Sequence, residues 1–273
     1  MNTARIAELL KSFLSARIAA PGGSAFPNSS LSGSSEFRHS EISQLFHSEP
    51  DTAGEESAVL SPAQLHDIST YINILLRWNA RINLTAVRDP EEIVTRHFGE
   101  SLFAARHLFP HTHVGTAAPG CPPERSSAAL AVADIGSGAG FPGIPLKLWA
   151  PHIALTLIES NHKKATFLRE VTRALTLTDV NIQNARAETL TEKTFDVVTL
   201  RAVERFASIL PVAGALVAPA GRLALLISAS QQAQAQASLP RFAWSEAVSV
   251  PSARARILLT GQHTVTSFVT SGM

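Results

Sequence analysis

Hydrophobic residues recur at two different spacings along the chain, and the spacing changes near residue 130. Between residues 62 and 108 the apolar positions lie three and four residues apart, as they do on one face of a helix. After residue 130, short apolar runs alternate with helical stretches at 142–150, 161–175 and 204–217. Strands that alternate with helices in this way predict an α/β fold with a doubly wound, mostly parallel sheet. The strands are expected to begin at Leu130, Ile153, Val180, Phe195 and Arg222, with two more within 242–250 and 255–260.

The same pattern divides the chain into four parts. Residues 1–60 include a segment rich in Ser, Gly and Pro that cannot bury enough surface to offset its chain entropy. We therefore expect a low-complexity, disordered extension, within which residues 2–20 have the spacing of a short amphipathic helix. The apolar side of that helix would hold Ile6, Leu9, Leu10, Phe13 and Leu14. A helical region over 61–109, capped by Ser61 and Pro62, a flexible loop over 110–128 and the α/β domain over 129–273 follow.

Composition narrows the class of protein. The 273 residues include 23 Lys and Arg and 22 Asp and Glu, so the net charge is +1. This balance excludes a protein whose whole surface is covered with basic residues that bind nucleic acid. Residues 1–60 carry four of the cations and seven of the anions, so the remaining chain has a net charge of +4. The single cysteine, Cys121, excludes an internal disulfide framework and a cysteine-based zinc cluster. Charges interrupt the N-terminal apolar stretch and Pro and Gly interrupt the run 209–227, so we expect a cytoplasmic protein that spans no membrane.

The most informative segment is the glycine-rich loop from Asp134 to Gly143, which follows the first strand of the α/β domain and precedes a helix. Glycines at 136, 138 and 140 let the backbone turn sharply and approach a ligand closely. A dinucleotide fingerprint would need its third glycine where Phe141 stands, so that match fails. An acidic residue just before G-x-G-x-G is typical of an S-adenosylmethionine (SAM) site. A tight turn without a ligand is the structural alternative.

Four further residues lie at the ends of three neighbouring strands. Glu159 ends the second strand, where a carboxylate can accept hydrogen bonds from the two ribose hydroxyls of an adenosine ligand. Ala187 and Glu188 follow the third strand, at the level of an adenine ring. Arg201 ends the fourth, where a guanidinium can bind a carboxylate through two hydrogen bonds. The candidate cofactor-binding residues are thus Asp134, Gly136, Gly138, Phe141, Glu159, Ala187, Glu188 and Arg201.

Several segments of the chain together resemble a known protein family. The segments 83–93, 96–98 and 101–102, the loop 134–146, and residues 157–160, 163–164, 167–168 and 201–203 are similar to the glucose-inhibited division protein B family. The resemblance covers roughly residues 62–230 and implies the class I SAM-dependent methyltransferase fold. It implies a bacterial enzyme that uses SAM to methylate N7 of guanine 527 in the 530 loop of 16S ribosomal RNA. It also implies that Gly136, Phe141, Ala187, Glu188 and Arg201 line the SAM site, with Arg201 on the methionine carboxylate.

The chemistry of this reaction sets further expectations. Guanine N7 has a lone pair and no proton, so we expect alignment without a general base, no catalytic triad and no metal. The partner would be 16S rRNA or the 30S subunit, and we expect a monomer. The residues expected to contact the RNA or its target base are Asn83, Arg88, Arg96, His97, Lys163 and Lys164. Arg77, Arg81, Arg169 and Arg173 would extend this basic face, although the same cations suit ordinary solvated helices.

The chain departs from the family at two places of interest. Ile227 and Ser228 stand where the family has Lys-Gly, and Gly99 and Glu100 stand where Leu-Asp is commoner. Two alternatives therefore stay open. One is a SAM methyltransferase with another substrate, and the other is an assembly factor that binds rRNA without transferring a methyl group.

Overall fold

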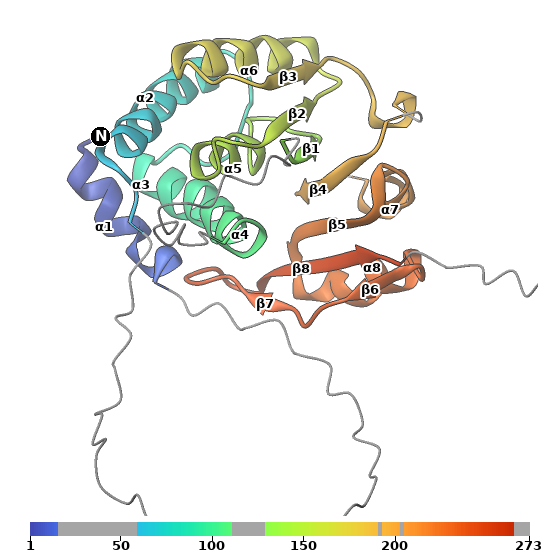
Figure 1. The fold of residues 1–273 in the computed structure, drawn as a ribbon. Coiled ribbons are helices and arrows are strands. Elements are labelled where there is room, and N and C mark those ends of the chain that lie inside the picture. The colour runs from blue at the N-terminus through green and yellow to red at the C-terminus, as the bar shows by residue number, and fades with distance from the viewer. Residues whose placement is uncertain (16–58, 111–128, 191–192, 203–204, 265–273) are drawn as a thin grey trace, which may run out of the picture.

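The fold was obtained as a computed structural model that describes residues 1–15, 59–110, 129–190, 193–202 and 205–264 (Figure 1). All but the first residue of the predicted loop 110–128 and most of the predicted extension lie outside these residues. No helix within the described ranges is long and apolar enough to cross a membrane.

An eight-stranded sheet forms the centre of the molecule (Figure 1). Its strands are β1 Ala131–Ile135, β2 Ala154–Ile158, β3 Val180–Gln183, β4 Phe195–Arg201, β5 Val217–Ser228, β6 Phe242–Trp244, β7 Val248–Ser249 and β8 Arg256–His263. The order across the sheet is β3-β2-β1-β4-β5-β8-β6, with β7 paired to β8. The first five strands are parallel, and β8 runs antiparallel to β5. The predicted doubly wound, mostly parallel sheet is confirmed.

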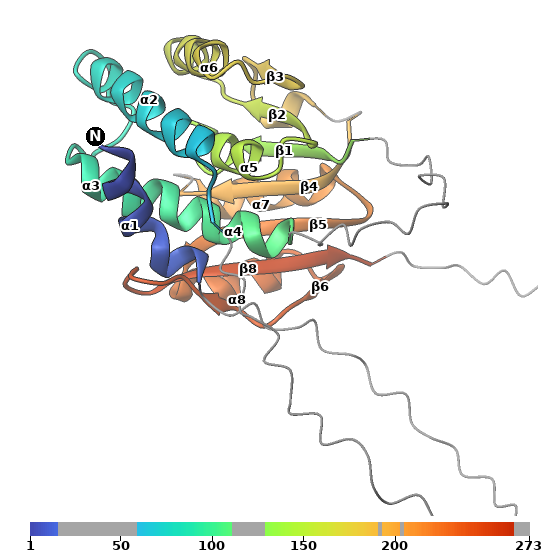
Figure 2. The same ribbon diagram turned by 60° about the vertical axis from the view of Figure 1, so that its left-hand side comes forward.

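Helices cover both faces of this sheet. They are α1 Thr3–Leu14, α2 Pro62–Asn79, α3 Pro90–Ile93, η1 Val94–Gly99, α4 Glu100–Leu108, α5 Gly143–Trp149, α6 His162–Ala174, η2 Ala187–Thr189, α7 Phe206–Ala215, η3 Ala229–Gln231 and α8 Gln232–Ser238. One core joins the helices α1 to α6 to one face of the sheet, and a second core joins α7 and α8 to the other. Figure 2 shows α1, α2, α4 and α5 on their common side. Successive strand residues alternate between the two cores because side chains in a strand point to opposite faces.

Helix α1 shows that the folded protein begins earlier than residue 61. Its predicted apolar side is buried at Ile6, Leu10, Phe13 and Leu14. It packs against α2, η1 and α4 (Figure 2). Arg5 joins it to Glu91 at the start of α3 through Nε–Oε1 and Nη2–Oε2 contacts of 2.7 and 2.8 Å. The amphipathic helix is confirmed, and the assignment of residues 3–14 to a disordered extension is wrong because this helix has a buried face.

The predicted helical region has its expected start and one irregularity. Ser61 and Gln64 form a capping box, in which each side chain accepts the other residue's backbone N–H, with Pro62 at the first helical position. The elements α3, η1 and α4 form one continuous helical segment from Pro90 to Leu108. The middle part of this segment, Val94–Gly99, is a π-helix. Such segments are rare and are frequently found at functional sites. This one contains Arg96 and His97.

Candidate functional site

The loop after β1 takes its shape from three glycines in the left-handed region. Gly136, Gly138 and Gly140 have φ angles of 67°, 54° and 86°. The backbone N–H groups of Gly136 and Ser137 donate to the carbonyl oxygen of Ile158, at 2.9 and 3.1 Å. The loop is therefore fixed over the carboxyl end of β2, the edge of a parallel sheet where ligands bind.

These glycines do not serve the same purpose. A Cβ on Gly140 would collide with the hydroxyl of Tyr71 and with Ile144, so this glycine allows the loop to pack on the core. A Cβ on Gly138 would meet only one atom within 4 Å, the carbonyl oxygen of Gly136 at 3.6 Å. Gly138 thus leaves open space beside the backbone, as a site that admits a ligand requires.

Asp134 organises this loop from inside the protein. Its Oδ1 accepts a hydrogen bond from the Thr199 hydroxyl at 2.9 Å, and its Oδ2 accepts one from the Gly143 backbone at 3.2 Å. Burial raises the pKa of Asp134 to about 6, although the hydrogen bonds from Thr199 and Gly143 oppose that rise. With 1% of its surface exposed, the predicted cofactor-binding aspartate holds β1, β4 and α5 together and shapes the loop.

Glu159 joins the end of β2 to the glycine loop. Its Oε2 accepts from the Gly138 backbone N–H at 2.9 Å, and its Oε1 accepts from the Asn161 N–H at 2.7 Å. A carboxylate offers about four acceptor positions, so each oxygen keeps capacity for a further donor. Ala187, in η2, is buried in the same core as Ile158, and Glu188 is exposed. The structure thus brings the loop and Glu159 into direct contact.

Arg201 turns toward the helices because of its place in β4. Val197, Thr199 and Arg201 point to the same face, because alternate residues of a strand share one. Val197 packs in the core that contains α4, and so Arg201 meets the helical region. The strand geometry therefore directs this guanidinium into the protein, where 7% of its side chain is exposed.

Two hydrogen-bond acceptors and one carboxylate surround one end of that guanidinium. The Nη2 atom of Arg201 donates to the carbonyl oxygen of Arg96 and lies 3.1 Å from Nδ1 of His97. It also lies 3.0 Å from Oε2 of Glu100, in an ion pair of which the glutamate is 3% exposed. By contrast, Nε of Arg201 is buried and has no hydrogen-bond partner among the described residues. An unpaired buried donor is costly, which makes this atom a candidate for a ligand oxygen.

The charge around Arg201 is unevenly balanced. Glu100 also faces Arg256, the first residue of β8, at 3.6 Å. Burial lowers the pKa of Arg201, and the neighbouring Arg256 lowers it further, whereas Glu100 raises it. Two arginines therefore flank the Glu100 carboxylate, and the carboxyl of Asp134 acts on Arg201 from a buried position. The paired arginines favour an additional anionic group.

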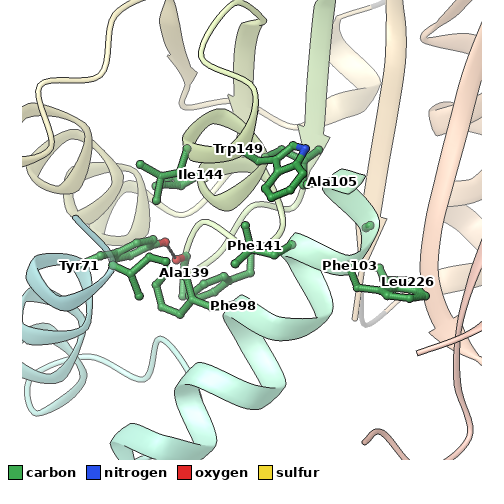
Figure 3. Packing of buried hydrophobic residues seen from close by; sticks show 14 of the residues in the cluster. Tyr71, Phe98, Phe103, Ala105, Ala139, Phe141, Ile144, Trp149 and Leu226 are labelled. Atoms are coloured by element: carbon green, nitrogen blue, oxygen red, sulfur yellow. Dashed lines mark hydrogen bonds between the residues drawn. The ribbon is translucent and has the colours of Figure 1, made fainter. Parts of the chain in front are cut away.

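Phe141 lies in an aromatic cluster at the end of the glycine loop. Its ring stacks on Tyr71 at 5.3 Å and meets Phe98 edge to face at 5.1 Å (Figure 3). It also stacks on the imidazole of His97 at 4.9 Å. The guanidinium carbon of Arg201 lies 5.9 Å from the ring centroid. Phe141, predicted to line the cofactor site, thus connects the loop to both the helical region and Arg201.

The predicted RNA-contacting residues fall into two groups. His97 and the backbone of Arg96 meet Arg201, whereas the Arg96 side chain turns outward to Glu92 at 2.6 Å. The others have exposed or half-buried side chains: Asn83, Arg88, Lys163 and Lys164. Lys163 and Lys164 lie in the first turn of α6, and no contact between described residues places them beside His97. The structure brings the first group to the site and leaves the second on the surface.

Four residues at the site were not predicted. Glu100 pairs with Arg201, and Thr199 bonds Asp134. Asn79 accepts from the backbone N–H groups of Leu84 and Thr85 through its Oδ1, and Thr85 bonds His97. Thr199 alternates with Arg201 along the strand, Thr85 lies in the segment 83–93 that resembles the family, and Glu100 marks a departure from it. The contacts of Glu100, Asn79 and Thr85 depend on how the helices dock, which a local pattern does not report.

Comparison with known proteins identifies the family of this chain. The model of the GidB family, rRNA small subunit methyltransferase G, matches residues 64–258. The protein of that name from Xanthomonas axonopodis pv. citri is 39% identical over 171 residues, which cover 62% of this chain and 72% of that protein. The one from Xylella fastidiosa is 42% identical over 154 residues, 56% of this chain and 64% of that protein.

Among solved structures, the ribosomal protein L11 methylase of Lactobacillus delbrueckii subsp. bulgaricus is similar with a TM-score of 0.48. It is 15% identical, and the match covers 62% of this chain and 79% of that one. The family match extends over the glycine loop, Glu159, Arg201 and the π-helix. It includes the helical region and the strands β1 to β7. The chain belongs to the rRNA small subunit methyltransferase G family and has the class I SAM-dependent methyltransferase fold.

Proposed function

We propose that this protein transfers a methyl group from SAM to N7 of guanine 527 in the 530 loop of 16S rRNA. Membership of the methyltransferase family supports the reaction. The observation that carries it is the buried Nε of Arg201, which has no hydrogen-bond partner in the part of the chain that the structure describes. The guanidinium carbon of this arginine lies 5.9 Å from the ring centroid of Phe141 in the glycine loop.

The donor set of the site fits SAM. The Nε atom of Arg201 would donate a hydrogen bond to the methionine carboxylate of SAM. That carboxylate would add a negative charge beside Arg201 and Arg256, which both face Glu100. Glu159 keeps acceptor capacity for ribose hydroxyls, and Gly138 leaves open space beside its backbone. Ala187 and Glu188 follow β3 and are proposed to lie against the adenine. Asp134 would act through the loop that it holds.

Methyl transfer to guanine N7 requires little chemistry from the protein's side chains. Bound SAM supplies an electrophilic methyl group on a positively charged sulfur. Guanine N7 bears no proton, so no residue need act as a general base, and the protein works by aligning the reactants and excluding water. Neither a metal ion nor a thiol has a role in this chemistry.

The target base must leave its helix, because N7 lies in the deep major groove of A-form RNA, which side chains do not reach. We propose that Asn83 and His97 lie on the side of the site from which the base enters. Arg88, Arg96, Lys163 and Lys164 have exposed or half-buried side chains that can contact phosphates. We further propose a cytoplasmic monomer that acts on 16S rRNA or the 30S subunit.

Transfer of label to rRNA tests the proposal. The purified protein would be incubated with labelled SAM and 30S subunits, or naked 16S rRNA, from a strain that lacks the enzyme. We expect label at N7 of guanine 527, and the two substrates show which form is used. The exposed Arg254→Ala variant serves as the active control and Arg201→Ala as the impaired one.

Two outcomes would contradict the proposal. Label on another molecule would favour a different methyl acceptor, and rRNA binding without transfer would favour an assembly factor. A first check is thermal: SAM should raise the melting temperature, because a ligand that binds only the folded state stabilises it. A shift with NAD and none with SAM would exclude the methyltransferase.

A further inference from the structure

We infer that Thr85 and His97 form a hydrogen-bonded relay that fixes the orientation of Arg201, so that Thr85 sets SAM affinity without touching SAM. This inference rests on the proposed function, because it assigns Arg201 to the cofactor. It makes Thr85 and His97 positioning residues. It also gives His97 a role different from direct contact with the target base.

The first link is between Arg201 and His97. An arginine side chain has only donors, so Nδ1 of His97, 3.1 Å from Nη2 of Arg201, must be the acceptor. The histidine is therefore neutral and carries its proton on Nε2. Burial and the charges of Arg201 and Arg96 hold the pKa of His97 at about 3, which agrees with the neutral ring that the geometry requires.

The second link is between His97 and Thr85. The Nε2 atom of His97 lies 2.8 Å from Oγ1 of Thr85, and its proton makes it the donor. The same hydroxyl oxygen accepts the backbone N–H of Val87 at 3.1 Å. Thr85 thus stabilises the tautomer whose Nδ1 faces Arg201. The other tautomer would place two donors against each other across the 3.1 Å contact.

The position of Thr85 is fixed because hydrogen bonds with the side chain of Asn79 hold its backbone. The buried side chain of Asn79 accepts from the N–H of Thr85 at 3.1 Å and donates to its carbonyl oxygen at 3.0 Å. Stacking of His97 on Phe141, at 4.9 Å, restricts the other end of the relay. The chain of contacts therefore runs from α2 through Thr85 and His97 to the Nη2 end of Arg201.

The orientation of Arg201 determines where its unpaired Nε points. The Nη2 atom donates hydrogen bonds to the carbonyl oxygen of Arg96 and to Nδ1 of His97, and it forms an ion pair with Glu100. The guanidinium plane is thereby fixed, and Nε is presented for a carboxylate. Removing the Thr85 hydroxyl leaves Nε2–H of His97 without its acceptor and releases the tautomer. Loss of one such hydrogen bond corresponds to about a fivefold change in affinity.

The test measures the dissociation constant of SAM by isothermal titration for Thr85→Val, Thr85→Ser and Thr95→Val in the full chain. Thr85→Val should weaken SAM binding about fivefold. Thr85→Ser, which keeps the hydroxyl, should restore binding to within about twofold of wild type. Thr95→Val is the matched control, because the Thr95 hydroxyl bonds only the backbone of Glu91 and Glu92 among the contacts described. It should bind SAM as the wild type does.

A double-mutant cycle separates a relay from two independent effects. If Thr85 acts through His97, Thr85→Val should have no further effect on SAM affinity in a His97→Ala background. Multiplied effects would overturn the relay, as would a Thr85→Val protein that binds SAM like wild type. A change confined to the KM for rRNA would instead mark Thr85 as an RNA contact and also overturn it. A wild-type protein that fails to bind SAM would overturn the proposed function and this inference with it.

Discussion

The ring of Phe13 occupies the space that a side chain on residue 99 would fill. A Cβ on Gly99 would come within 2.6 to 2.7 Å of three ring atoms of Phe13. Phe13 is 1% exposed, and Arg106 donates to its carbonyl oxygen at 3.2 Å at the end of α1. Gly99 directly precedes Glu100, the partner of Arg201. Helix α1 is thus packed on the segment that carries the site.

Gly99→Ala should change stability with opposite signs in two backgrounds. In the wild type the new methyl group overlaps Phe13, which should lower the free energy of unfolding by about 1–3 kcal/mol. Phe13→Ala alone should lower it by about 3–5 kcal/mol through the cavity it leaves. In the Phe13→Ala background the overlap is gone, and Gly99 has helical angles of −57° and −53°. There Gly99→Ala should add about 0.5–1 kcal/mol. Urea unfolding of the four proteins measures this, and a destabilising Gly99→Ala in both backgrounds would refute the contact.

Arg201→Ala should affect cofactor binding and stability together. Loss of a charge-assisted hydrogen bond from Nε should weaken SAM binding by about 10- to 100-fold. The substitution also takes a partner from buried Glu100, which should cost up to about 3 kcal/mol, less where Arg256 compensates. Isothermal titration and urea unfolding measure the two effects, with exposed Arg254→Ala as the control. An unchanged SAM dissociation constant in a folded Arg201→Ala protein would refute the assignment of the carboxylate.

The loop glycines should separate binding from stability. Gly138 and Gly140 both have a positive φ, so replacing either with alanine should lower the free energy of unfolding by about 1–2 kcal/mol. Gly140→Ala adds a collision with Tyr71 and Ile144, so its free energy of unfolding should fall by several kcal/mol. Gly138→Ala faces open space, so it should fold with little further cost and bind SAM at least tenfold more weakly. Unfolding and titration of both variants test this. A Gly138→Ala protein with normal SAM affinity would show that the space beside Gly138 is not the cofactor's.

The sequence predicted the elements of this fold more completely than the contacts of its site. Periodicity placed the parallel strands and their helices, because each element buries a face that its own spacing records. The inward direction of Arg201 could also be derived from its alternation with Val197 and Thr199. Its partner Glu100 could not, because that pair joins positions a hundred residues apart and depends on how α4 docks on the sheet.

Local sequence patterns also did not predict the packing of α1, the π-helix or the hydrogen bonds of Asp134. The amphipathic spacing of residues 3–14 was visible, but whether that helix packs depends on the space left by Gly99. The π-helix at Val94–Gly99 lies inside a continuous helical pattern and has no separate sequence signal. Asp134 was identified by its place before the glycines, whereas its hydrogen bonds to Thr199 and Gly143 required the folded chain.

Asp134 should give the protein a measurable pH dependence of stability. Its folded pKa of about 6 lies above that of an unfolded aspartate, about 3.9, so the folded state binds the proton more tightly. The contribution of the proton is fully present below pH 3.9 and is lost as pH rises through 6. Relative to Asp134→Asn, the wild type should gain roughly 2–3 kcal/mol between pH 7 and pH 4. Urea unfolding of both proteins across this range measures the gain. A difference that does not change with pH would mean that the buried carboxyl keeps an ordinary pKa.

His97 should remain neutral and keep its proton on Nε2 under all conditions in which the protein is active. Burial and the charges of three arginines, Arg201, Arg96 and Arg256, lower its pKa to about 3, against about 6.5 in an unfolded chain. The folded state therefore loses stability relative to the unfolded state as pH falls below 6.5, a trend opposite to that of Asp134. Nitrogen-15 spectra of the labelled imidazoles should include a histidine that does not titrate between pH 8 and 5 and carries its proton on Nε2. Burial also lowers the pKa of His107, but its Nδ1 donates to the carbonyl oxygen of Phe103, so its neutral form has the other tautomer. The His97→Gln protein, which lacks that signal, provides the assignment. A proton on Nδ1 would place two donors between His97 and Arg201, and would contradict both their hydrogen bond and the relay built on it.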